Sequence, residues 1–270
     1  MRFQPSGAYQ PIQPPEPGSD RQSALAFSLA KAGSTLLYDM LSVLAPEAGL
    51  TYFSVEDALF AGDISVNNRP SNVGNLFRQE GYCYGGFRQF PAYPIPILHS
   101  TKSIFLVRDP RDMAVSLYFS MMKSHVLPEG SGAEGGARAE FEKARANVAS
   151  VPIDAWVIHA AAIQYTRMFE GYLAQGFLWR SNVVTYRYED VIFDKRGWLA
   201  DICDWLEWDV PADRRDAIAD RFDIRPDVER PDQHVRQVTP GNYKAHLTAD
   251  TIDRLNGLFA EYLRLYDYVD

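Results

Sequence analysis

The sequence predicts an α/β fold with a central, mostly parallel sheet that helices cover on both faces. Short apolar runs typical of buried strands alternate with segments whose apolar residues recur at helical spacing. Such alternation is typical of strands joined by crossover helices, which pair in parallel. The chain has 270 residues, of which 46% are hydrophobic and 23% charged, so a packed core is expected rather than disorder.

The first predicted strand is the apolar run ALAFSLA at residues 24–30, followed by the tight turn KAGST at 31–35. A helix begins directly afterwards, because apolar residues at positions 36, 37, 40, 41 and 44 fall on one helical face. The segment from 51 to 96 is rich in Gly, Asn, Pro and Tyr, and we expect it to be irregular.

A second strand is expected over 103–107, and a helix from about Pro110 to Lys123. The Gly-rich segment 128–136 predicts a loop, either a surface linker or a lid over a site. The remaining elements are expected in this order: helices over 139–147 and 153–174, a strand that begins at Asn182, and amphipathic helices over 195–208 and 248–265.

Composition separates the N-terminal segment from the rest of the chain. Residues 1–20 are Pro-rich and predict a disordered or loosely docked arm, and residues 21–270 are expected to form a single domain. No run of about 18 apolar residues occurs, so no membrane span is expected. The two cysteines, Cys83 and Cys203, have no metal-type spacing, and a reducing, cytoplasmic location is expected.

The net charge of −8 and the pI near 5.2 argue against a general nucleic-acid binder, which is normally basic. A local phosphate site stays compatible with this charge, because a few converging donors suffice. The sequence shows no cluster of metal ligands, and no metal is expected.

The turn after the first strand has the residues of an anion site. Gly33 permits a tight turn and close backbone approach, while Ser34 and Thr35 place hydroxyl groups at a helix start. Lys31 adds a mobile positive charge. A helix start that binds no ligand is the alternative. The triphosphate loop G-x-x-x-x-G-K-[ST] is absent.

A second candidate anion site follows the strand at 103–107. Arg108 stands at its carboxyl end, where ligands bind in open α/β sheets, and Asp109 is a plausible N-cap of the next helix. Ser116 lies about two turns further on and returns to the same face. The alternative is that Arg108 pairs with Asp112 or Asp190 and that Ser116 is a surface residue.

Four motifs resemble, in order, those of the sulfotransferases that use phosphoadenosine phosphosulfate (PAPS). AKAGST resembles their 5′-phosphosulfate loop, and RDPRDMAVS resembles their 3′-phosphate motif with its arginine and serine. YRYEDV (186–191) resembles their Y-E-D segment, and VRQVTPGNYKAHLT (235–248) resembles their C-terminal loop. The resemblance implies a three-layer sandwich like that of P-loop NTPases.

The resemblance also implies the residues that bind PAPS and its product PAP. These are Lys31, Ala32, Gly33, Ser34 and Thr35 at the 5′ end, with Arg108, Ser116, Tyr188 and Arg236 at the 3′ end. A packed aromatic residue is the alternative for Tyr188. The C-terminal loop departs from the family pattern, because Gln237 and Val238 stand where Lys and Gly are usual.

The implied reaction is in-line transfer of the sulfuryl group from PAPS to a hydroxyl or amine, without a metal. Lys31 would neutralise charge on the departing phosphate. Gln89 stands where many cytosolic members have a basic histidine, whereas carbohydrate-acting members use a glutamate. Glu56 is therefore the first candidate base, followed by Asp57 and then His99.

A glycan or glycolipid is the favoured acceptor, with another small molecule as the alternative, because a carboxylate base is favoured over a histidine. Two other functions stay open. The chain could be an ATP-dependent P-loop phosphotransferase, or a module that binds PAP or phosphate without catalysis.

Overall fold

The computed structural model describes residues 12–61, 71–124, 143, 145–225 and 238–268. The chain divides into two compact units. One unit, called the sheet unit below, comprises Met1–Val107 and Gly171–Asp223. The other, called the helical unit, comprises Arg108–Glu170 and Ile224–Asp270.

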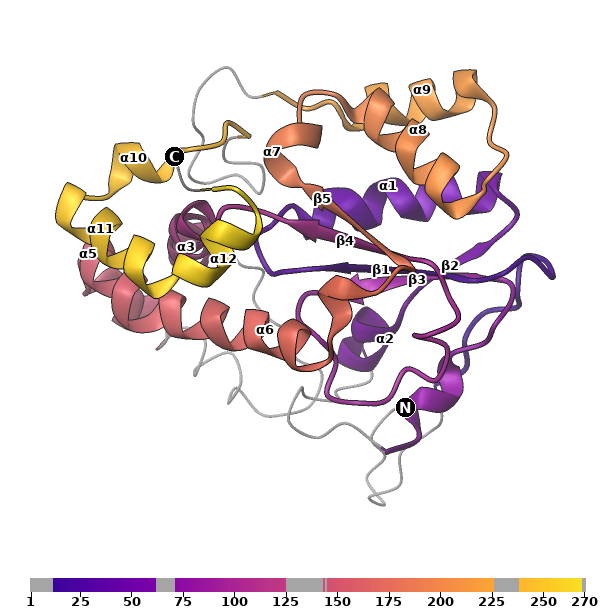
Figure 1. Cartoon of the computed structure of the whole chain (residues 1–270), viewed down its shortest axis with the longest axis horizontal. Coiled ribbons are helices and arrows are strands. Elements are labelled where there is room, and N and C mark those ends of the chain that lie inside the picture. Colours follow the sequence, from indigo (N-terminus) through magenta and orange to yellow (C-terminus); the bar gives the residue numbers. More distant parts are fainter. Residues whose placement is uncertain (1–11, 62–70, 125–142, 144, 226–237, 269–270) are drawn as a thin grey trace. The chain divides into compact units, whose positions relative to one another are not determined.

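A five-stranded parallel sheet with the order β2-β3-β1-β4-β5 forms the centre of the sheet unit (Figure 1). Its strands are β1 (Ala24–Ser28), β2 (Thr51–Ser54), β3 (Tyr82–Phe87), β4 (Ser103–Val107) and β5 (Val183–Arg187). Because all pairs are parallel, the carboxyl ends of the strands share one edge.

Helices lie on both faces of this sheet (Figure 1). On one face are α1 (Ser34–Glu47), α8 (Lys195–Leu206) and α9 (Ala212–Phe222), while α2 (Val55–Ala61) lies on the other. The short helix α7 (Tyr188–Val191) follows β5. The predicted α/β class with a parallel sheet flanked by helices is therefore confirmed.

Strands β1, β3 and β4 are buried along their whole length, as expected for the middle of a parallel sheet covered on both faces. The ring of Phe27 on β1 lies 4.8 Å from the rings of both Phe87 and Phe177, and Phe105 lies 4.5 Å from Tyr172. This aromatic cluster forms the core on one side of the central strand.

The expectation that residues 51–96 are irregular is wrong. This segment contains β2, α2, the 3₁₀ helix η1 (Ser71–Leu76) and β3. The Tyr/Gly-rich run YCYGGF pairs as a strand because its aromatic residues pack into the core. Gly85 leaves room for a neighbour, since a Cβ atom there would lie 2.5 Å from the Tyr52 hydroxyl.

The helical unit begins with α3 (Pro110–Phe119), which continues as the π-helical turn η2 (Ser120–Ser124). It then contains α5 (Ile153–Trp156), the π-helical turn η3 (Val157–Ala161) and α6 (Ala162–Ala174), whose residues from Gly171 onward belong to the sheet unit. Its last elements are α10 (Tyr243–His246), α11 (Ala249–Leu258) and α12 (Ala260–Leu265).

The predicted helices over 153–174, 195–208 and 248–265 are thus confirmed, although Phe259 separates the last into α11 and α12. Of the predicted helix 139–147, the described residues 143 and 145–147 are helical, and the helix continues to residue 149. Helix α9 was not predicted. The Gly-rich segment 128–136 lies outside the described residues.

Part of the predicted N-terminal arm is hydrogen-bonded to the sheet unit. The carbonyl of Pro15 accepts from the Tyr82 hydroxyl at 2.7 Å, and the carbonyl of Glu16 accepts from Thr51 at 2.8 Å. Residues 1–11 lie outside the described residues.

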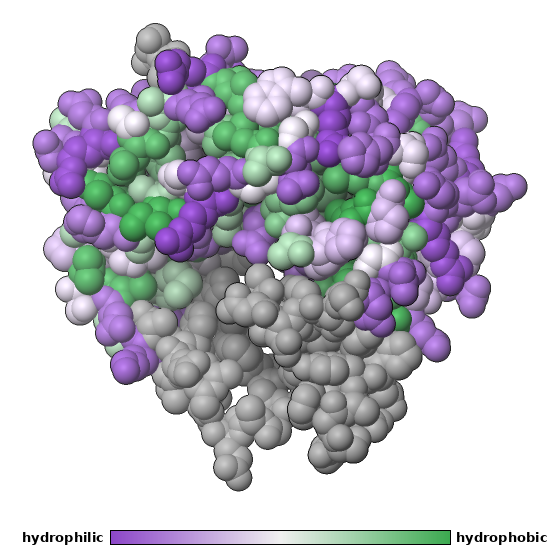
Figure 2. All heavy atoms as spheres, turned by 60° about the horizontal axis from the view of Figure 1, so that its bottom comes forward, coloured by the Kyte–Doolittle hydropathy of each residue, from purple (hydrophilic) through white to green (hydrophobic). Residues whose placement is uncertain are grey.

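The surface drawn in Figure 2 has hydrophilic residues interspersed with hydrophobic ones across its described part. Over the described ranges, no helix is long and apolar enough to cross a membrane. Cys83 and Cys203, both in the sheet unit, are buried free thiols.

Candidate active site

The turn between β1 and α1 is built from two residues in the left-handed region. Lys31 has φ 69° and Gly33 has φ 91°, and α1 begins at Ser34. No side-chain hydrogen bond caps this end of α1. The first N–H groups of a helix have no partner within the helix, so an end without a side-chain cap favours an anion.

Gly33 lies against Tyr188, the first residue after β5. A Cβ atom at Gly33 would lie 2.8 Å from Cδ2 of Tyr188 and 3.4 Å from Cδ2 of Leu106. Both the positive φ and this close approach require glycine here. The structure therefore brings Tyr188 to the turn as a buried, packed ring.

The end of β3 adjoins the same turn. The backbone N–H of Ala30 donates to the carbonyl of Arg88 at 2.9 Å. The Arg88 guanidinium lies 3.3 Å from Oδ1 of Asp57 and 5.8 Å from the centre of the Tyr38 ring. Burial raises the pKa of the Tyr38 hydroxyl above its usual range, and Arg88 opposes this shift.

The candidate bases Glu56 and Asp57 stand in the first turn of α2, directly after β2. The Asp57 carboxylate accepts a hydrogen bond from the Ser54 hydroxyl at 2.6 Å, besides its ion pair with Arg88. Oε1 of Glu56 accepts from the hydroxyl of buried Tyr93 at 2.6 Å. Two carboxylates with different partners thus stand side by side.

Three groups of candidate residues, together with Arg88, therefore meet the same edge of the sheet. The turn at 31–35 follows β1, Glu56 and Asp57 follow β2, Arg88 follows β3, and Tyr188 follows β5. Crevices outside the carboxyl ends of parallel strands are where α/β sheets bind ligands.

His99 is not brought to this group. It precedes the amino end of β4, and its ring nitrogen Nδ1 lies 2.7 Å from Nη1 of Arg180, which precedes β5. Both residues therefore stand at the edge opposite the turn after β1.

Arg108 directly follows β4 and opens the helical unit. Asp109 is the N-cap of α3, as predicted, and accepts from the backbone N–H of Arg111 at 2.9 Å. Of the two acids considered as partners of Arg108, Asp112 forms an ion pair with it at 3.4 Å. Asp190 pairs with Arg187 at 3.6 Å in the sheet unit.

Ser116 is half-buried on α3, on the helix that begins with the Asp109 cap. Arg236, the remaining residue expected at the 3′ end, lies outside the described residues.

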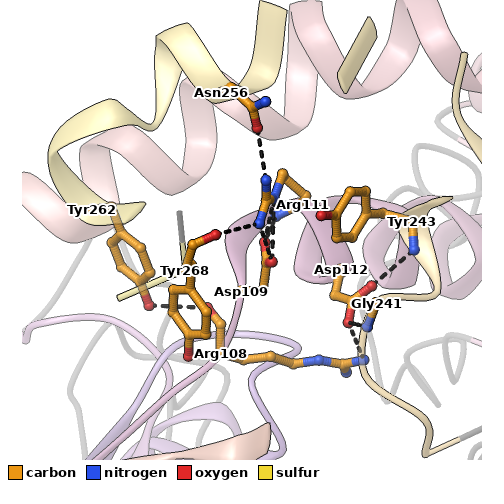
Figure 3. A network of polar contacts seen from close by, with 9 residues as sticks. All are labelled: Arg108, Asp109, Arg111, Asp112, Gly241, Tyr243, Asn256, Tyr262 and Tyr268. Carbon is orange, nitrogen blue, oxygen red and sulfur yellow. Dashed lines mark hydrogen bonds and ion pairs between the residues drawn. The ribbon is translucent and has the colours of Figure 1, made fainter. Parts of the chain in front are cut away.

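Sequence reasoning missed Arg111, which connects α3 with the last part of the helical unit (Figure 3). Its Nη2 donates to Oδ2 of Asp109 at 2.7 Å and to the carbonyl of Tyr268 at 2.9 Å. Its Nη1 donates to Asn256 at 2.7 Å, and its guanidinium lies 4.5 Å from the centre of the Tyr243 ring.

Burial lowers the pKa of the Arg111 guanidinium, but the hydrogen bonds and charge of Asp109 outweigh this effect and hold the pKa above its usual value. Arg111 therefore stays charged within its buried network. The only signal in the sequence is the second Arg-Asp pair of RDPRD.

Within the described ranges, no three or more His, Cys, Asp or Glu side chains gather in a way that could hold a metal ion.

The family model of the sulfotransferase domain matches residues 90–267, a range that includes Arg108, Ser116 and Tyr188 but begins after the turn at 31–35. No curated protein sequence matches the chain significantly.

Solved structures of other proteins share the fold. Mouse sulfotransferase SULT7A1 complexed with PAP is 19% identical with a TM-score of 0.56, over 92% of this chain and 85% of that chain. Retinol dehydratase complexed with retinol and PAP is 14% identical with a TM-score of 0.53, over 91% of this chain and 82% of that chain. Retinol dehydratase complexed with androsterone and PAP is 14% identical with a TM-score of 0.52, over 89% of this chain and 80% of that chain.

These low identities show the fold alone, and the likeness agrees with the sandwich that the sequence motifs imply. The family match is stronger, because it covers more than half of the chain and includes four of the expected binding residues, Arg236 among them. The chain belongs to the sulfotransferase domain family.

Proposed function

We propose that this protein transfers the sulfuryl group of PAPS to a hydroxyl or amine of an acceptor and releases PAP. The observation that carries the proposal is the turn at 31–35. It enters α1 without a side-chain cap and adjoins, through Ala30 and Arg88, the candidate base Asp57 and its neighbour Glu56.

The two candidate phosphate sites are chemically different, and both fit an anionic ligand. The N-terminus of α1 has no side-chain cap, so its backbone N–H groups suit a phosphosulfate. The N-terminus of α3 carries the Asp109 carboxylate as its cap. Binding near α3 would therefore depend on side chains, chiefly Arg108 and Ser116.

In this proposal Lys31, Ala32, Gly33, Ser34 and Thr35 bind the 5′ end of PAPS, while Arg108, Ser116, Tyr188 and Arg236 bind the 3′ end. PAPS supplies an activated sulfuryl group with PAP as leaving group. Lys31 neutralises the charge that grows on the leaving phosphate, and no metal is needed for this role. The PAP in the complexes of SULT7A1 and retinol dehydratase supports this choice of ligand.

Glu56 is the base that we propose, with Asp57 as the second choice. Taking up a proton would cost Asp57 its ion pair with Arg88. Glu56 would keep the hydrogen bond from Tyr93 if its other oxygen took the proton. His99 has no part in the proposal, because it stands at the opposite edge of the sheet.

The favoured acceptor is a glycan or glycolipid hydroxyl, because the proposed base is a carboxylate. Retinol and androsterone in the retinol dehydratase complexes keep apolar small molecules as the alternative class. We also propose a cytoplasmic location, which is consistent with the free thiols of Cys83 and Cys203.

Two experiments test the function. Thermal unfolding is measured with PAP and, separately, with ATP and Mg²⁺; stabilisation by PAP alone is expected, because a ligand of the native state stabilises it by RT ln(1 + [L]/Kd). Stabilisation by ATP and Mg²⁺ alone would instead indicate a phosphotransferase.

Transfer from sulfur-labelled PAPS is then measured on panels of glycans, glycolipids, phenols, steroids and amines. Labelling of at least one panel is expected, with the highest rate on glycans or glycolipids. Binding of PAP without transfer to any panel would favour a non-catalytic module.

A further inference from the structure

We propose that Asp112 is a positioning residue that holds the Arg108 guanidinium and residues 238–247 in one arrangement that binds phosphate. This part of the segment 235–248, which includes α10, is called the C-terminal loop below. The inference rests on the proposed function, because it takes Arg108 as a ligand of the 3′ end of PAP. It goes further by assigning a role to an acidic residue that itself contacts no phosphate.

The carboxylate of Asp112 is buried, and both of its oxygens accept hydrogen bonds (Figure 3). Oδ1 accepts from the backbone N–H of Tyr243 at 2.9 Å, and Oδ2 accepts from the backbone N–H of Gly241 at 2.8 Å. Nη2 of Arg108 lies 3.4 Å from the same Oδ2. One side chain thus joins α3, the C-terminal loop and Arg108.

The three contacts of Asp112 differ in length and in the kind of donor. The two bonds from Gly241 and Tyr243 are short and come from backbone groups, so they fix the carboxylate. The contact with Arg108 is longer and involves a flexible side chain that is itself buried. The carboxylate is thus held against the loop, and Nη2 of Arg108 contacts the same oxygen that accepts from Gly241.

A second contact holds the loop from another side. The guanidinium of Arg111 lies 4.5 Å from the centre of the Tyr243 ring and is itself bound to Asp109, the N-cap of α3. The ring and the backbone of Tyr243 are thus held by neighbouring residues of one helix. Binding groups held by such supporting contacts keep their geometry more accurately than groups on a loop alone.

Because Asp112 is charged, the direction in which PAP affinity changes on its replacement distinguishes a positioning role from a purely electrostatic one. A carboxylate beside Arg108 repels an incoming phosphate, so removing its charge should tighten binding if charge were its only influence. If Asp112 acts by orienting Arg108, the isosteric change Asp112→Asn should instead weaken binding. The asparagine side chain has an NH2 group in place of one carboxylate oxygen. This group is a donor, and it cannot accept a hydrogen bond from the N–H groups of Arg108, Gly241 or Tyr243.

The test is a double-mutant cycle on PAP affinity, measured by calorimetry. Asp112→Asn is expected to raise the Kd for PAP by roughly fivefold to tenfold when Arg108 is present, within the usual range of coupling between contacting residues. In the Arg108→Ala background the same change should leave the Kd unchanged or lower it. Equal weakening in both backgrounds, or no weakening beside Arg108, would overturn the proposal.

Asp154→Asn is the matched control. Asp154 also accepts from a backbone N–H, that of Thr248 at 2.9 Å, and it belongs to the same helical unit. This change should leave PAP affinity unaltered.

If Asp112→Asn does not fold, Gly241→Ala tests the same link. Gly241 has φ 79°, which strains a residue with a side chain, while an added Cβ would meet nothing within 4 Å. This change should weaken PAP binding only when Arg108 is present.

A measurement without PAP separates this inference from the proposed function. Asp112→Asn should speed amide hydrogen exchange at Gly241 and Tyr243, whereas Arg108→Ala should not; unchanged exchange in Asp112→Asn would remove the link to the loop. If Arg108→Ala leaves PAP affinity unaltered, the assignment of Arg108 fails in the proposed function itself. If Arg108→Ala weakens binding and Asp112→Asn does not, only the present inference fails.

Discussion

Gly33 and Tyr188 are in direct contact: a Cβ atom at Gly33 would lie 2.8 Å from Cδ2 of the tyrosine ring. The glycine follows β1 and the tyrosine follows β5, so the contact joins the turns after two strands of one sheet. Any side chain at position 33 would have to displace a buried ring.

Gly33→Ala is therefore expected to destabilise the fold by about 1–3 kcal/mol, the usual cost of a non-glycine residue in a strained backbone region. PAP affinity should fall as well, because the turn would shift. Chemical denaturation and calorimetry measure the two effects. Gly257→Ala in α11, where an added Cβ meets nothing within 4 Å, is the control and should change stability by less than about 1 kcal/mol. Equal stability of the two variants would contradict the role of Gly33.

Lys31→Ala is expected to lower kcat by about 100-fold or more while PAP affinity changes much less. The charge that Lys31 neutralises grows in the transition state, so its loss affects the barrier more than ground-state binding. Turnover with labelled PAPS and the Kd for PAP are the measurements. Lys102→Ala is the control, since Lys102 binds Glu207 at 2.6 Å near the amino end of β4. A loss of affinity as large as the loss of turnover would argue against this role.

Arg108→Ala is expected to weaken PAP binding by about 1.5–3 kcal/mol, the range for a hydrogen bond to a charged group. Calorimetry gives the change in Kd directly. Arg180→Ala serves as the comparison, because Arg180 pairs with His99 at the other edge of the sheet. Unaltered affinity for PAP in Arg108→Ala would remove this residue from the 3′-phosphate site.

Glu56→Gln is expected to lower kcat by about 10²–10⁴-fold, the usual contribution of a general base, with PAP affinity retained. Asp57→Asn should have the smaller effect on kcat. Initial rates at saturating acceptor for both variants decide between the two carboxylates. The reverse order would assign the base to Asp57.

Burial raises the pKa of the Cys83 thiol to about 12, so this thiol stays protonated in the folded protein at neutral pH. A thiol reagent at pH 8 should modify Cys83 only after unfolding. Because the pKa is higher in the folded than in the unfolded state, the contribution of Cys83 to stability is complete below about pH 8.5 and is lost as pH rises toward 12. Fast labelling of native protein at Cys83 would contradict this environment.

Local signals explain the parts of the fold that sequence reasoning predicted. The apolar run of β1 and the glycine turn before α1 lie next to each other in the chain, and so do β4, the Asp109 cap and α3. Strand β3 was missed because YCYGGF has no β-branched residue and gains its burial from partners distant in the sequence such as Phe27, whose ring lies 4.8 Å from that of Phe87.

Helix α9 was missed for another reason: its sequence ADRRDAIADRF is mostly charged, and only Ile218 and Ala219 are buried. The candidate site likewise contains features that local sequence predicts and features that depend on residues far apart in the chain. The turn at 31–35 could be placed from sequence, because it follows a predicted strand and ligands bind at the carboxyl ends of parallel strands. Glu56 and Asp57 could be named only through the family resemblance, because β2 and α2 were not predicted. The bond from Gly241 to Asp112 could not, because it joins residues 129 positions apart.

The bond from Arg111 to the carbonyl of Tyr268 bears on how this polypeptide can be shortened or tagged. If the polypeptide ended before Tyr268, the buried guanidinium of Arg111 would lose this carbonyl acceptor, and one of its N–H donors would be poorly satisfied. Any shortened form of the protein should therefore retain Tyr268, and an affinity tag that follows it should be joined through a spacer.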